Sequence, residues 1–219
     1  SKLPHKLLGS ALKLRKGTVE ARKNFEKTRP ALIAGFGGYP SYPSLSAARE
    51  LKIPILIHEQ NSVLGRVNRL FAPHARFVAC GFDRLDKLPP AAADQKRVVG
   101  NPVRSPVLAV RARPYPEAPA GGKLNILVIG GSQGARLFGE VIPAAIALLP
   151  PELRNRVEIV QQAREEQVAA VRAVYEKAKV KAEIAPFFTD MGQRLAIAHL
   201  VIARAGASSV TELQVAGRP

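Results

Sequence analysis

The sequence predicts an α/β protein, because three segments repeat the same order of apolar strand, glycine-containing turn and helix start. They are residues 31–44 (ALIAGFGGYPSYPS), 124–136 (LNILVIGGSQGAR) and 200–212 (LVIARAGASSVTE). A helix that directly follows a strand presents unpaired backbone N–H groups and the positive end of its dipole at the turn. Such turns bind phosphate, so the repeated plan indicates a phosphorylated ligand at the carboxyl ends of parallel strands.

The turn at residues 130–134 is the most glycine-rich of the three. Gly130, Gly131 and Gly134 let the backbone approach a ligand closely, and Ser132 adds a hydroxyl group. No Lys-Ser or Lys-Thr pair follows the last glycine, which excludes the P-loop of nucleotide hydrolases, and the G-x-G-x-x-G spacing of dinucleotide folds is absent. By itself the turn is equally well explained as a tight strand-to-helix connection.

Apolar runs and helical spacing predict the individual elements in order. A long first helix is expected to break near Gly9 or Gly17, and Lys52 with Pro54 ends the second helix. In the first half we expect helix 2–28, strand 31–35, helix 44–51, strand 53–57, helix 63–71, strand 77–80 and strand 97–99. In the second half we expect strand 125–129, helix 135–149, strand 157–160, helix 165–179, strand 182–185, helix 191–198, strand 200–203 and helix 209–216.

Residues 105–122 are rich in proline, alanine and glycine, a composition typical of linkers. The sequence therefore predicts one domain at 1–104, a linker at 105–122 and a second domain at 123–219. The chain begins with Ser1 rather than Met, and it stops just after Gly217, a predicted helix C-cap. We therefore expect an internal fragment of a longer protein, with both domains partial.

The formal net charge is +16, and residues 1–29 hold nine Lys and Arg against two Glu. In this segment leucines recur at helical spacing beside basic residues, namely Leu3, Leu7 and Leu14 with Lys6, Lys13, Arg15 and Lys16. A basic helix with an apolar stripe suits the surface of an anionic membrane, and a core-facing helix with a solvated basic back fits equally well. Nucleic acid is not expected as a partner, because no aromatic stacking platform or known nucleic-acid motif accompanies the charge.

Composition excludes two other classes. No run of about 18 apolar residues is present, so the sequence predicts no membrane-spanning helix. Cys80 is the only cysteine, which excludes an internal disulfide and makes the cytosol the default compartment.

Five motifs occur in a specific order along the chain. They are GFGGYPSYPS (35–44), IPILIHEQNSVLGRVNRLFA (53–72), VVGNPVR (98–104), ILVIGGSQGAR (126–136) and ARAGASSVTEL (203–213). Together they resemble the MurG family of glycosyltransferases nearly from end to end. The resemblance implies a GT-B fold, in which two Rossmann-like domains with parallel sheets face a central cleft. Here the N-terminal domain, which faces the acceptor and the membrane, would be incomplete, and the C-terminal domain would bind the UDP-sugar.

The resemblance also implies the reaction. Family members transfer N-acetylglucosamine from UDP-GlcNAc to undecaprenyl-pyrophosphoryl-MurNAc-pentapeptide (lipid I), with inversion at the anomeric carbon, in peptidoglycan synthesis. No metal ion or other cofactor is expected. The implied location is peripheral, at the cytoplasmic face of the bacterial plasma membrane, where cell-wall biogenesis supports cell shape and division.

Carried over position by position, the resemblance implies a donor site. Ser132 would contact the diphosphate, and Arg104, a permanent cation at a strand end, would reach phosphate. Glu212 would accept the ribose hydroxyls, although Ser209-x-x-Glu212 also reads as a structural capping box. The main chain of Phe188 would read uracil. Other expected donor contacts are Asn61 and the helix start Ala207, Ser208, Ser209, Val210 and Thr211.

The catalytic base stays unassigned. His58 and Glu59 are candidates because a strand end delivers them to the expected cleft, but neighbours on a strand point to opposite faces and cannot both address one proton. By the same resemblance, Gly37 and Gly38 would hold the pyrophosphate of the acceptor. Three alternatives remain: a related transferase with another lipid acceptor, a UDP-sugar epimerase of the same architecture, and a non-catalytic basic membrane-binding protein.

Overall fold

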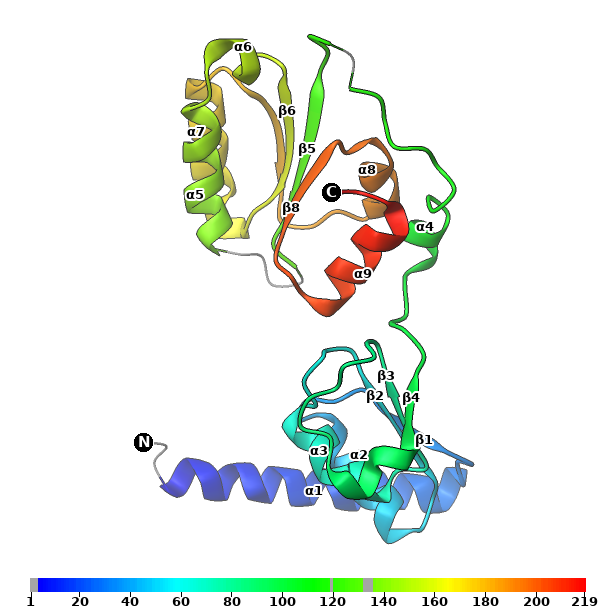
Figure 1. Cartoon of the computed structure of the whole chain (residues 1–219). Coiled ribbons are helices and arrows are strands. Elements are labelled where there is room, and N and C mark those ends of the chain that lie inside the picture. Colours follow the sequence, from blue (N-terminus) through cyan, green and yellow to red (C-terminus); the bar gives the residue numbers. More distant parts are fainter. Residues whose placement is uncertain (1–3, 119, 132–135) are drawn as a thin grey trace. The chain divides into compact units, whose positions relative to one another are not determined.

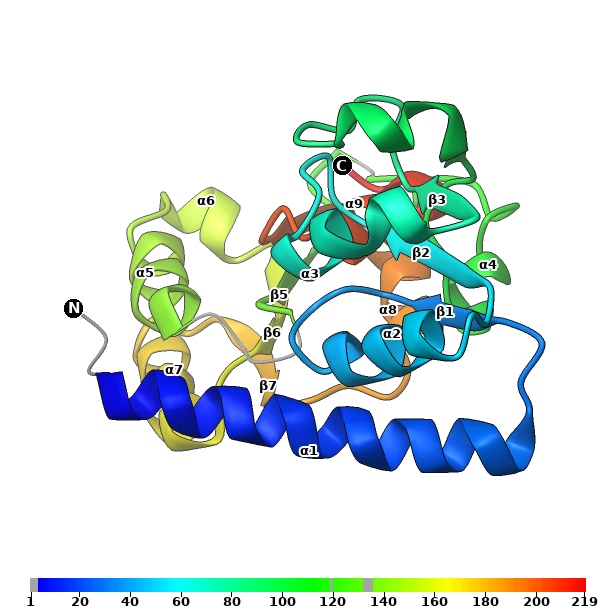
Figure 2. The ribbon, with the colours of Figure 1, turned by 90° about the horizontal axis from the view of Figure 1, so that it is seen from below.

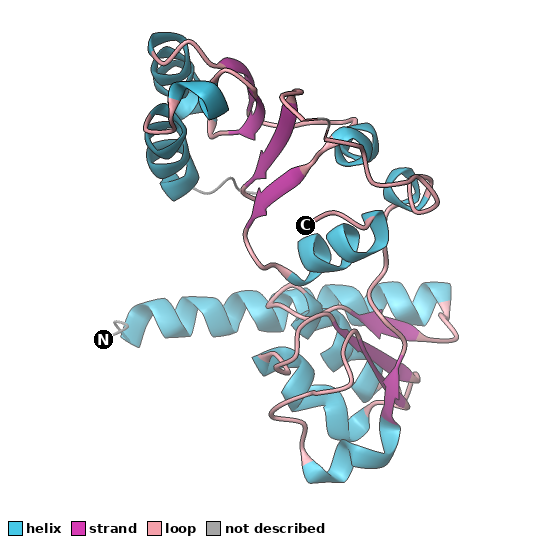
Figure 3. Ribbon diagram, turned by 45° about the horizontal axis from the view of Figure 1, so that its top comes forward, coloured by secondary structure: helices cyan, strands magenta, loops and turns pink. Residues whose placement is uncertain are grey.

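The computed structural model describes residues 4–118, 120–131 and 136–219. The chain divides into two compact units, one ending at Asn101 and the other starting at Pro102. Each unit has its own sheet with helices packed on it (Figure 3). The predicted α/β class with two Rossmann-like regions is thus confirmed.

The sheet of the first unit contains four parallel strands in the order β1-β2-β3-β4. They are β1 (Ile33–Gly35), β2 (Ile55–Glu59), β3 (Phe77–Cys80) and β4 (Lys96–Val98). The register pairs Gly35 with Ile57 and Glu59 with Cys80. Strand β2, of sequence ILIHE, therefore ends with His58 and Glu59 at the carboxyl edge of the sheet, as the apolar run before them predicts.

Three α-helices belong to this unit: α1 (Pro4–Thr28), α2 (Ser41–Glu50) and α3 (Arg66–Phe71). Two short 3₁₀ helices, η1 (Ala72–His74) and η2 (Pro90–Gln95), complete it. Leu45 of α2 and Phe71 of α3 are buried with Ile57 of β2 and Val78 of β3 in one core. Helix α1 is continuous (Figure 2), so the break expected near Gly9 or Gly17 is wrong. A Cβ at Gly17 would stand 3.1 Å from the Pro43 ring, so glycine there permits close packing on α2.

The expected membrane-facing residues of α1 have different surroundings. Leu14 is half-buried and lines a shallow groove with Thr18 and Tyr42, whereas Lys13, Arg15 and Lys16 are exposed. Lys6 and Leu7 lie within α1, and Leu3 lies outside the described residues. From Leu14 onward this helix is therefore core-facing with a basic solvated back. Within the described ranges, no helix combines the length and apolarity needed to cross a bilayer.

The sheet of the second unit has the order β7-β6-β5-β8, again all parallel. Its strands are β5 (Leu124–Ile129), β6 (Val157–Gln162), β7 (Lys181–Ala185) and β8 (Leu200–Ala203). Helices α5 (Arg136–Ala147) and α7 (Val168–Lys177) cover one face, and α8 (Met191–Ile197) and α9 (Ala207–Ala216) cover the other (Figure 1). The short helices α6 (Pro151–Arg154) and η3 (Glu165–Gln167) connect the elements.

Part of the predicted linker is folded. Residues 105–108 form helix α4 (Ser105–Leu108), which packs against α8 and α9. Val107 and Val110 are buried in the same core as Leu127 and Leu195. Proline suits the first turn of a helix as well as a linker, so composition alone misassigned this segment. The boundary observed at Asn101 and Pro102 therefore replaces the one expected at residue 104, and residues 105–110 belong to the second unit.

Candidate functional site

A pocket of about 320 Å³ lies in the second unit, at the carboxyl ends of β5 and β6 and beside the start of α9. In a parallel α/β sheet this edge is where ligands bind. Most of its polar lining comes from residues far apart in the sequence, among them Arg104, Gly131, Gln162, Ser208, Ser209 and Glu212. Phe187, Phe188 and Met191 form the apolar part of the wall.

Arg104 and Glu212 form a two-pronged ion pair in this wall. Arg104 Nε lies 2.6 Å from Glu212 Oε1, and Arg104 Nη2 lies 2.7 Å from Glu212 Oε2. The hydrogen bonds to Glu212 raise the pKa of Arg104 above its ordinary value. Arg104 precedes α4 and remains largely exposed, while Glu212 is buried in α9. Two residues expected at the donor site are thus in direct contact.

The start of α9 does not use the capping box. The helix begins at Ala207 with Gly206 as its N-cap, so Ser209 lies inside the first turn. Glu212 extends to Arg104 instead, and the capping-box interpretation is therefore wrong. Ser208 and Ser209 line the pocket, whereas the Thr211 hydroxyl donates to the Ala207 carbonyl and Val210 N donates to the Gly206 carbonyl.

The glycine-rich turn after β5 is described as far as Gly131. Gly131 lines the pocket with φ of +80°, a conformation that favours glycine. Gly130 is buried, and its N–H donates to Gln162 Oε1 at 3.2 Å. Ser132 and Gly134 lie outside the described residues.

Phe188 has a buried ring, and Phe187 beside it is exposed along the pocket wall. The guanidinium carbon of Arg194 lies 4.1 Å from the centre of the Phe188 ring, within the range of a cation–π contact. Motif matching had marked Phe188 but neither Gln162 nor Arg194. Their roles depend on contacts across the sheet that sequence spacing does not encode.

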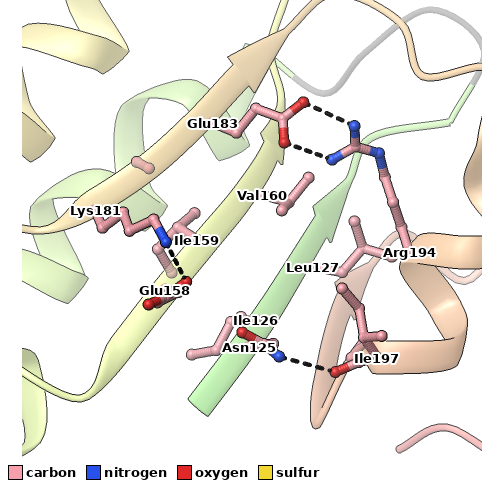
Figure 4. A pocket seen from close by; sticks show the side chains of 12 residues that line it. Asn125, Ile126, Leu127, Glu158, Ile159, Val160, Lys181, Glu183, Arg194 and Ile197 are labelled. Carbon is pink, nitrogen blue, oxygen red and sulfur yellow. Dashed lines mark hydrogen bonds and ion pairs between the residues drawn. The ribbon is translucent and has the colours of Figure 1, made fainter. Parts of the chain in front are cut away.

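A second pocket of about 290 Å³ opens on the α8 side of β5, β6 and β7 (Figure 4). Its charged residues are already paired, Glu183 with Arg194 and Glu158 with Lys181. Because these charges neutralise one another, the pocket offers little to a charged ligand, and the bond to Glu183 holds Arg194 in place.

In the first unit, Glu59 organises the loop that follows β2. Its carboxylate is 4% exposed and accepts hydrogen bonds from Asn61 N, Asn61 Nδ2, Gly65 N and Asn68 Nδ2, at 2.9–3.1 Å. Asn61 is itself exposed, so this carboxylate sets the position of its side-chain amide. With four donors on two oxygens, Glu59 holds the loop rather than presenting a vacant oxygen.

His58 is similarly engaged and is 5% exposed. Its Nε2 donates to the Gly100 carbonyl at 3.0 Å, and its Nδ1 accepts from Gln60 Nε2 at 3.0 Å. Because a carbonyl oxygen can only accept, Nε2 is the ring nitrogen that donates to Gly100. Both candidates for proton transfer therefore have bonded partners inside the first unit, which favours a supporting role for each.

Gly37 and Gly38 form the turn between β1 and α2. Their φ angles are +82° and +73°, and a Cβ at Gly37 would stand 3.0 Å from Asn68 Nδ2. The Ser41 hydroxyl donates to the Gly37 carbonyl and closes the turn against the start of α2. The geometry thus explains both glycines, and acceptor binding by them stays a prediction.

Comparison with known proteins places the chain in a family. Residues 1–80 match the glycosyltransferase family 28 N-terminal domain, and residues 125–219 match its C-terminal domain. A relative from Maricaulis maris is 51% identical over all 219 residues and is named UDP-N-acetylglucosamine--N-acetylmuramyl-(pentapeptide) pyrophosphoryl-undecaprenol N-acetylglucosamine transferase. One of the same name from Rhodospirillum centenum is 52% identical over 96% of the chain. The chain spans 60% and 55% of the lengths of these relatives.

Solved structures agree with the sequence matches. MurG from Acinetobacter baumannii superposes with a TM-score of 0.69 at 34% identity, over 93% of this chain and 55% of that one. A UDP-GlcNAc 2-epimerase from Neisseria meningitidis superposes with a TM-score of 0.64 at 14% identity, over 96% and 63% of the two chains, which shows a shared GT-B fold alone. Since both halves match the same family in order, the chain belongs to glycosyltransferase family 28, among relatives that carry the MurG name.

Proposed function

We propose that this chain belongs to an inverting transferase that moves N-acetylglucosamine from UDP-GlcNAc to lipid-linked muramyl pentapeptide, and that its second unit binds the donor. The observation that carries the proposal is the pocket at the end of the β7-β6-β5-β8 sheet. It brings a permanent cation, Arg104, together with a carboxylate, Glu212, and the glycine turn at Gly131. A nucleoside diphosphate offers phosphates to the cation and the turn, and ribose hydroxyls to the carboxylate.

The chemistry follows from the leaving group. As the glycosidic bond to UDP breaks, negative charge develops on the diphosphate, and fixed donors lower the barrier by stabilising that charge. Arg104 and the N–H groups of Gly131 and of the start of α9 supply such donors. Ser132 completes the diphosphate contacts in this proposal, and Glu212 accepts the ribose hydroxyls once Arg104 turns toward phosphate. The main chain of Phe188 reads uracil, and Asn61 bonds a sugar hydroxyl.

The acceptor and membrane contacts fall to the first unit. The Gly37–Gly38 turn at the start of α2 binds the pyrophosphate of lipid I in this proposal. The exposed basic residues of α1, with Leu12 exposed beside them, bind an anionic membrane surface. The protein then acts peripherally at the cytoplasmic face of the plasma membrane, in cell-wall synthesis.

The test is a transfer assay with the full-length protein that contains this chain. Labelled UDP-GlcNAc is mixed with a lipid-linked muramyl acceptor, and we expect acceptor-dependent release of UDP and a β-linked product. Ser132→Ala and Glu212→Ala should raise the KM for UDP-GlcNAc, with Glu176→Ala on the exposed side of α7 as the control. Conversion of UDP-GlcNAc to its 2-epimer without acceptor, or unchanged donor affinity in both pocket variants, would contradict the proposal.

A further inference from the structure

Gln162 bridges two loops that both contribute residues to the wall of the donor pocket. Its Oε1 accepts from Gly130 N–H at 3.2 Å, at the start of the glycine turn, and its Nε2 donates to the Pro186 carbonyl at 3.0 Å. Pro186 follows β7 and directly precedes Phe187 and Phe188. We propose that Gln162 is a positioning residue that sets the spacing between the diphosphate and nucleobase parts of the site. This inference rests on the proposed function of the pocket.

A glutamine is well suited to bridge these two backbone groups. One bridge must offer an acceptor to a backbone N–H and a donor to a backbone carbonyl, and a glutamine side chain provides both. Gln162 is 7% exposed, and an apolar replacement would leave the buried Gly130 N–H without this partner and would release the loop at the Pro186 carbonyl. Gln162 is also the last residue of β6, the strand between β5 and β7, from which the two loops leave.

The loop from Pro186 to Asp190 has a second anchor that does not involve the pocket. Arg194 lies over the Phe188 ring, and its Nε donates to Asp190 Oδ1 at 2.7 Å. Two further hydrogen bonds join its guanidinium to the Glu183 carboxylate at 2.7 and 2.8 Å (Figure 4). The loop is thus fixed at the Phe188 ring by Arg194 and at Pro186 by Gln162. In the part of the glycine turn that the structure describes, Gln162 contacts Gly130 and so joins this loop to the turn.

A nucleoside diphosphate must satisfy both loops at once, because its base and its phosphates are joined by one ribose. A bridge of fixed length holds the two loops at a set spacing before the ligand binds. Less conformational entropy of the loops is then lost on binding. Loss of the bridge should therefore weaken UDP binding and, since the base is read by main-chain groups, also weaken the discrimination between uracil and other bases.

Gln161 offers a matched control in the same strand. It is 0% exposed, and its Nε2 donates to the Phe138 carbonyl at 3.0 Å while its Oε1 accepts from the Tyr175 hydroxyl. Successive strand residues point to opposite faces, and Gln161 accordingly bonds to α5 and α7, away from the pocket. Gln161→Met and Gln162→Met each remove one buried amide that bridges two groups, yet only Gln162→Met removes the contact between the loops.

The experiment compares these variants in the full-length protein, with folding checked by denaturant unfolding and with UDP, CDP and pyrophosphate titrated by calorimetry. We expect Gln162→Met to weaken UDP binding about tenfold and to reduce the ratio of UDP to CDP affinity, with a smaller loss for pyrophosphate. Gln161→Met should bind UDP as the wild type does. Gln162→Glu, which keeps the acceptor for Gly130 but loses the donor to Pro186, provides the same comparison if the methionine variant does not fold.

The outcomes separate the inference from the function on which it rests. Wild-type affinity and base discrimination in both Gln162 variants, or an equal loss in Gln161→Met and Gln162→Met, would overturn the positioning role. Failure of the wild-type protein to bind UDP at all would instead overturn the proposed function.

Discussion

Arg104 and Glu212 lie 108 positions apart in the chain and meet in a two-pronged ion pair, with N–O distances of 2.6 and 2.7 Å. This pair links the segment just before α4 to helix α9 across the wall of the pocket. Because Glu212 is buried and Arg104 is largely exposed, the arginine can move away at lower cost than the glutamate. Each side chain is thus held by the other in the wall of this pocket.

We expect Arg104→Ala and Glu212→Ala each to lower UDP affinity. A hydrogen bond to a charged group contributes about 1.5–3 kcal/mol, which corresponds to roughly ten- to hundredfold in binding. The double variant should lose less than the sum of the two single losses, because the residues contact each other. Calorimetric titration with UDP measures all three, and Arg104→Lys, which keeps the charge without the planar fork, should be intermediate. Additive losses would show that the pair is incidental to binding.

From the contacts of His58 and Glu59 we expect a substitution of His58 to change activity little and a substitution of Glu59 to lower stability. His58→Gln keeps a donor within reach of the Gly100 carbonyl, so we expect most transferase activity to remain. Glu59→Gln turns one acceptor oxygen into a donor that faces N–H groups, and should lower the free energy of unfolding by about 1–3 kcal/mol. Activity assays and urea unfolding of both variants measure these effects. Normal stability with activity abolished in either variant would identify that residue as a proton-transfer group.

Two glycines of the first unit should respond in opposite directions to alanine. Gly37 has φ of +82° and lies close to the Asn68 amide, so Gly37→Ala should destabilise the protein by about 1–2 kcal/mol. Gly9 lies inside α1 with open space around it, so Gly9→Ala should stabilise by about 0.5–1 kcal/mol. Urea unfolding of the two variants tests both signs. Stabilisation by Gly37→Ala would mean that the turn adopts another conformation in solution.

The Arg194 cluster predicts a pH dependence of stability. Hydrogen bonds from Arg194 lower the pKa of both Glu183 and Asp190. A carboxylate with a lowered native pKa stabilises the fold above its unfolded pKa, about 4.3 for Glu, and this contribution disappears as the pH falls through the native pKa. Glu183→Gln should therefore lose less stability than the wild type between about pH 7 and about pH 3. Unfolding curves of the wild type, Glu183→Gln and the control Glu176→Gln at these two pH values measure the difference. Equal losses of stability in all three proteins would refute the prediction.

Most strands could be predicted from the sequence, because each is a short apolar run bounded by charged residues or glycine. The run that contains Val78 is an example. Strands 77–80 and 200–203 were predicted with the observed bounds. The fold of residues 105–110 was not, because proline and alanine suit both linkers and helix starts, and only packing against Leu195 decides between them. Motifs indicated Arg104 and Glu212, but local spacing also allowed a capping box at Glu212, and only the tertiary fold reveals the contact between the two residues. The roles of Gln162 and Arg194 could not be predicted from the sequence for the same reason, because they depend on contacts that only the tertiary fold creates.

The hydrogen bond from His58 to Gly100 also affects the junction between the two units. Asn101 Nδ2 donates to the Gln60 carbonyl at 3.1 Å, so the last residues of the first unit are tied back to the loop after β2. On the other side, Val103 packs into a core of the second unit and Arg104 is held by Glu212. Pro102 lies between these two anchored segments, and its ring restricts rotation about its own φ. The chain therefore passes from one unit to the next through a short segment, and a substitution of Pro102 would act both on this segment and on the pocket that Pro102 borders.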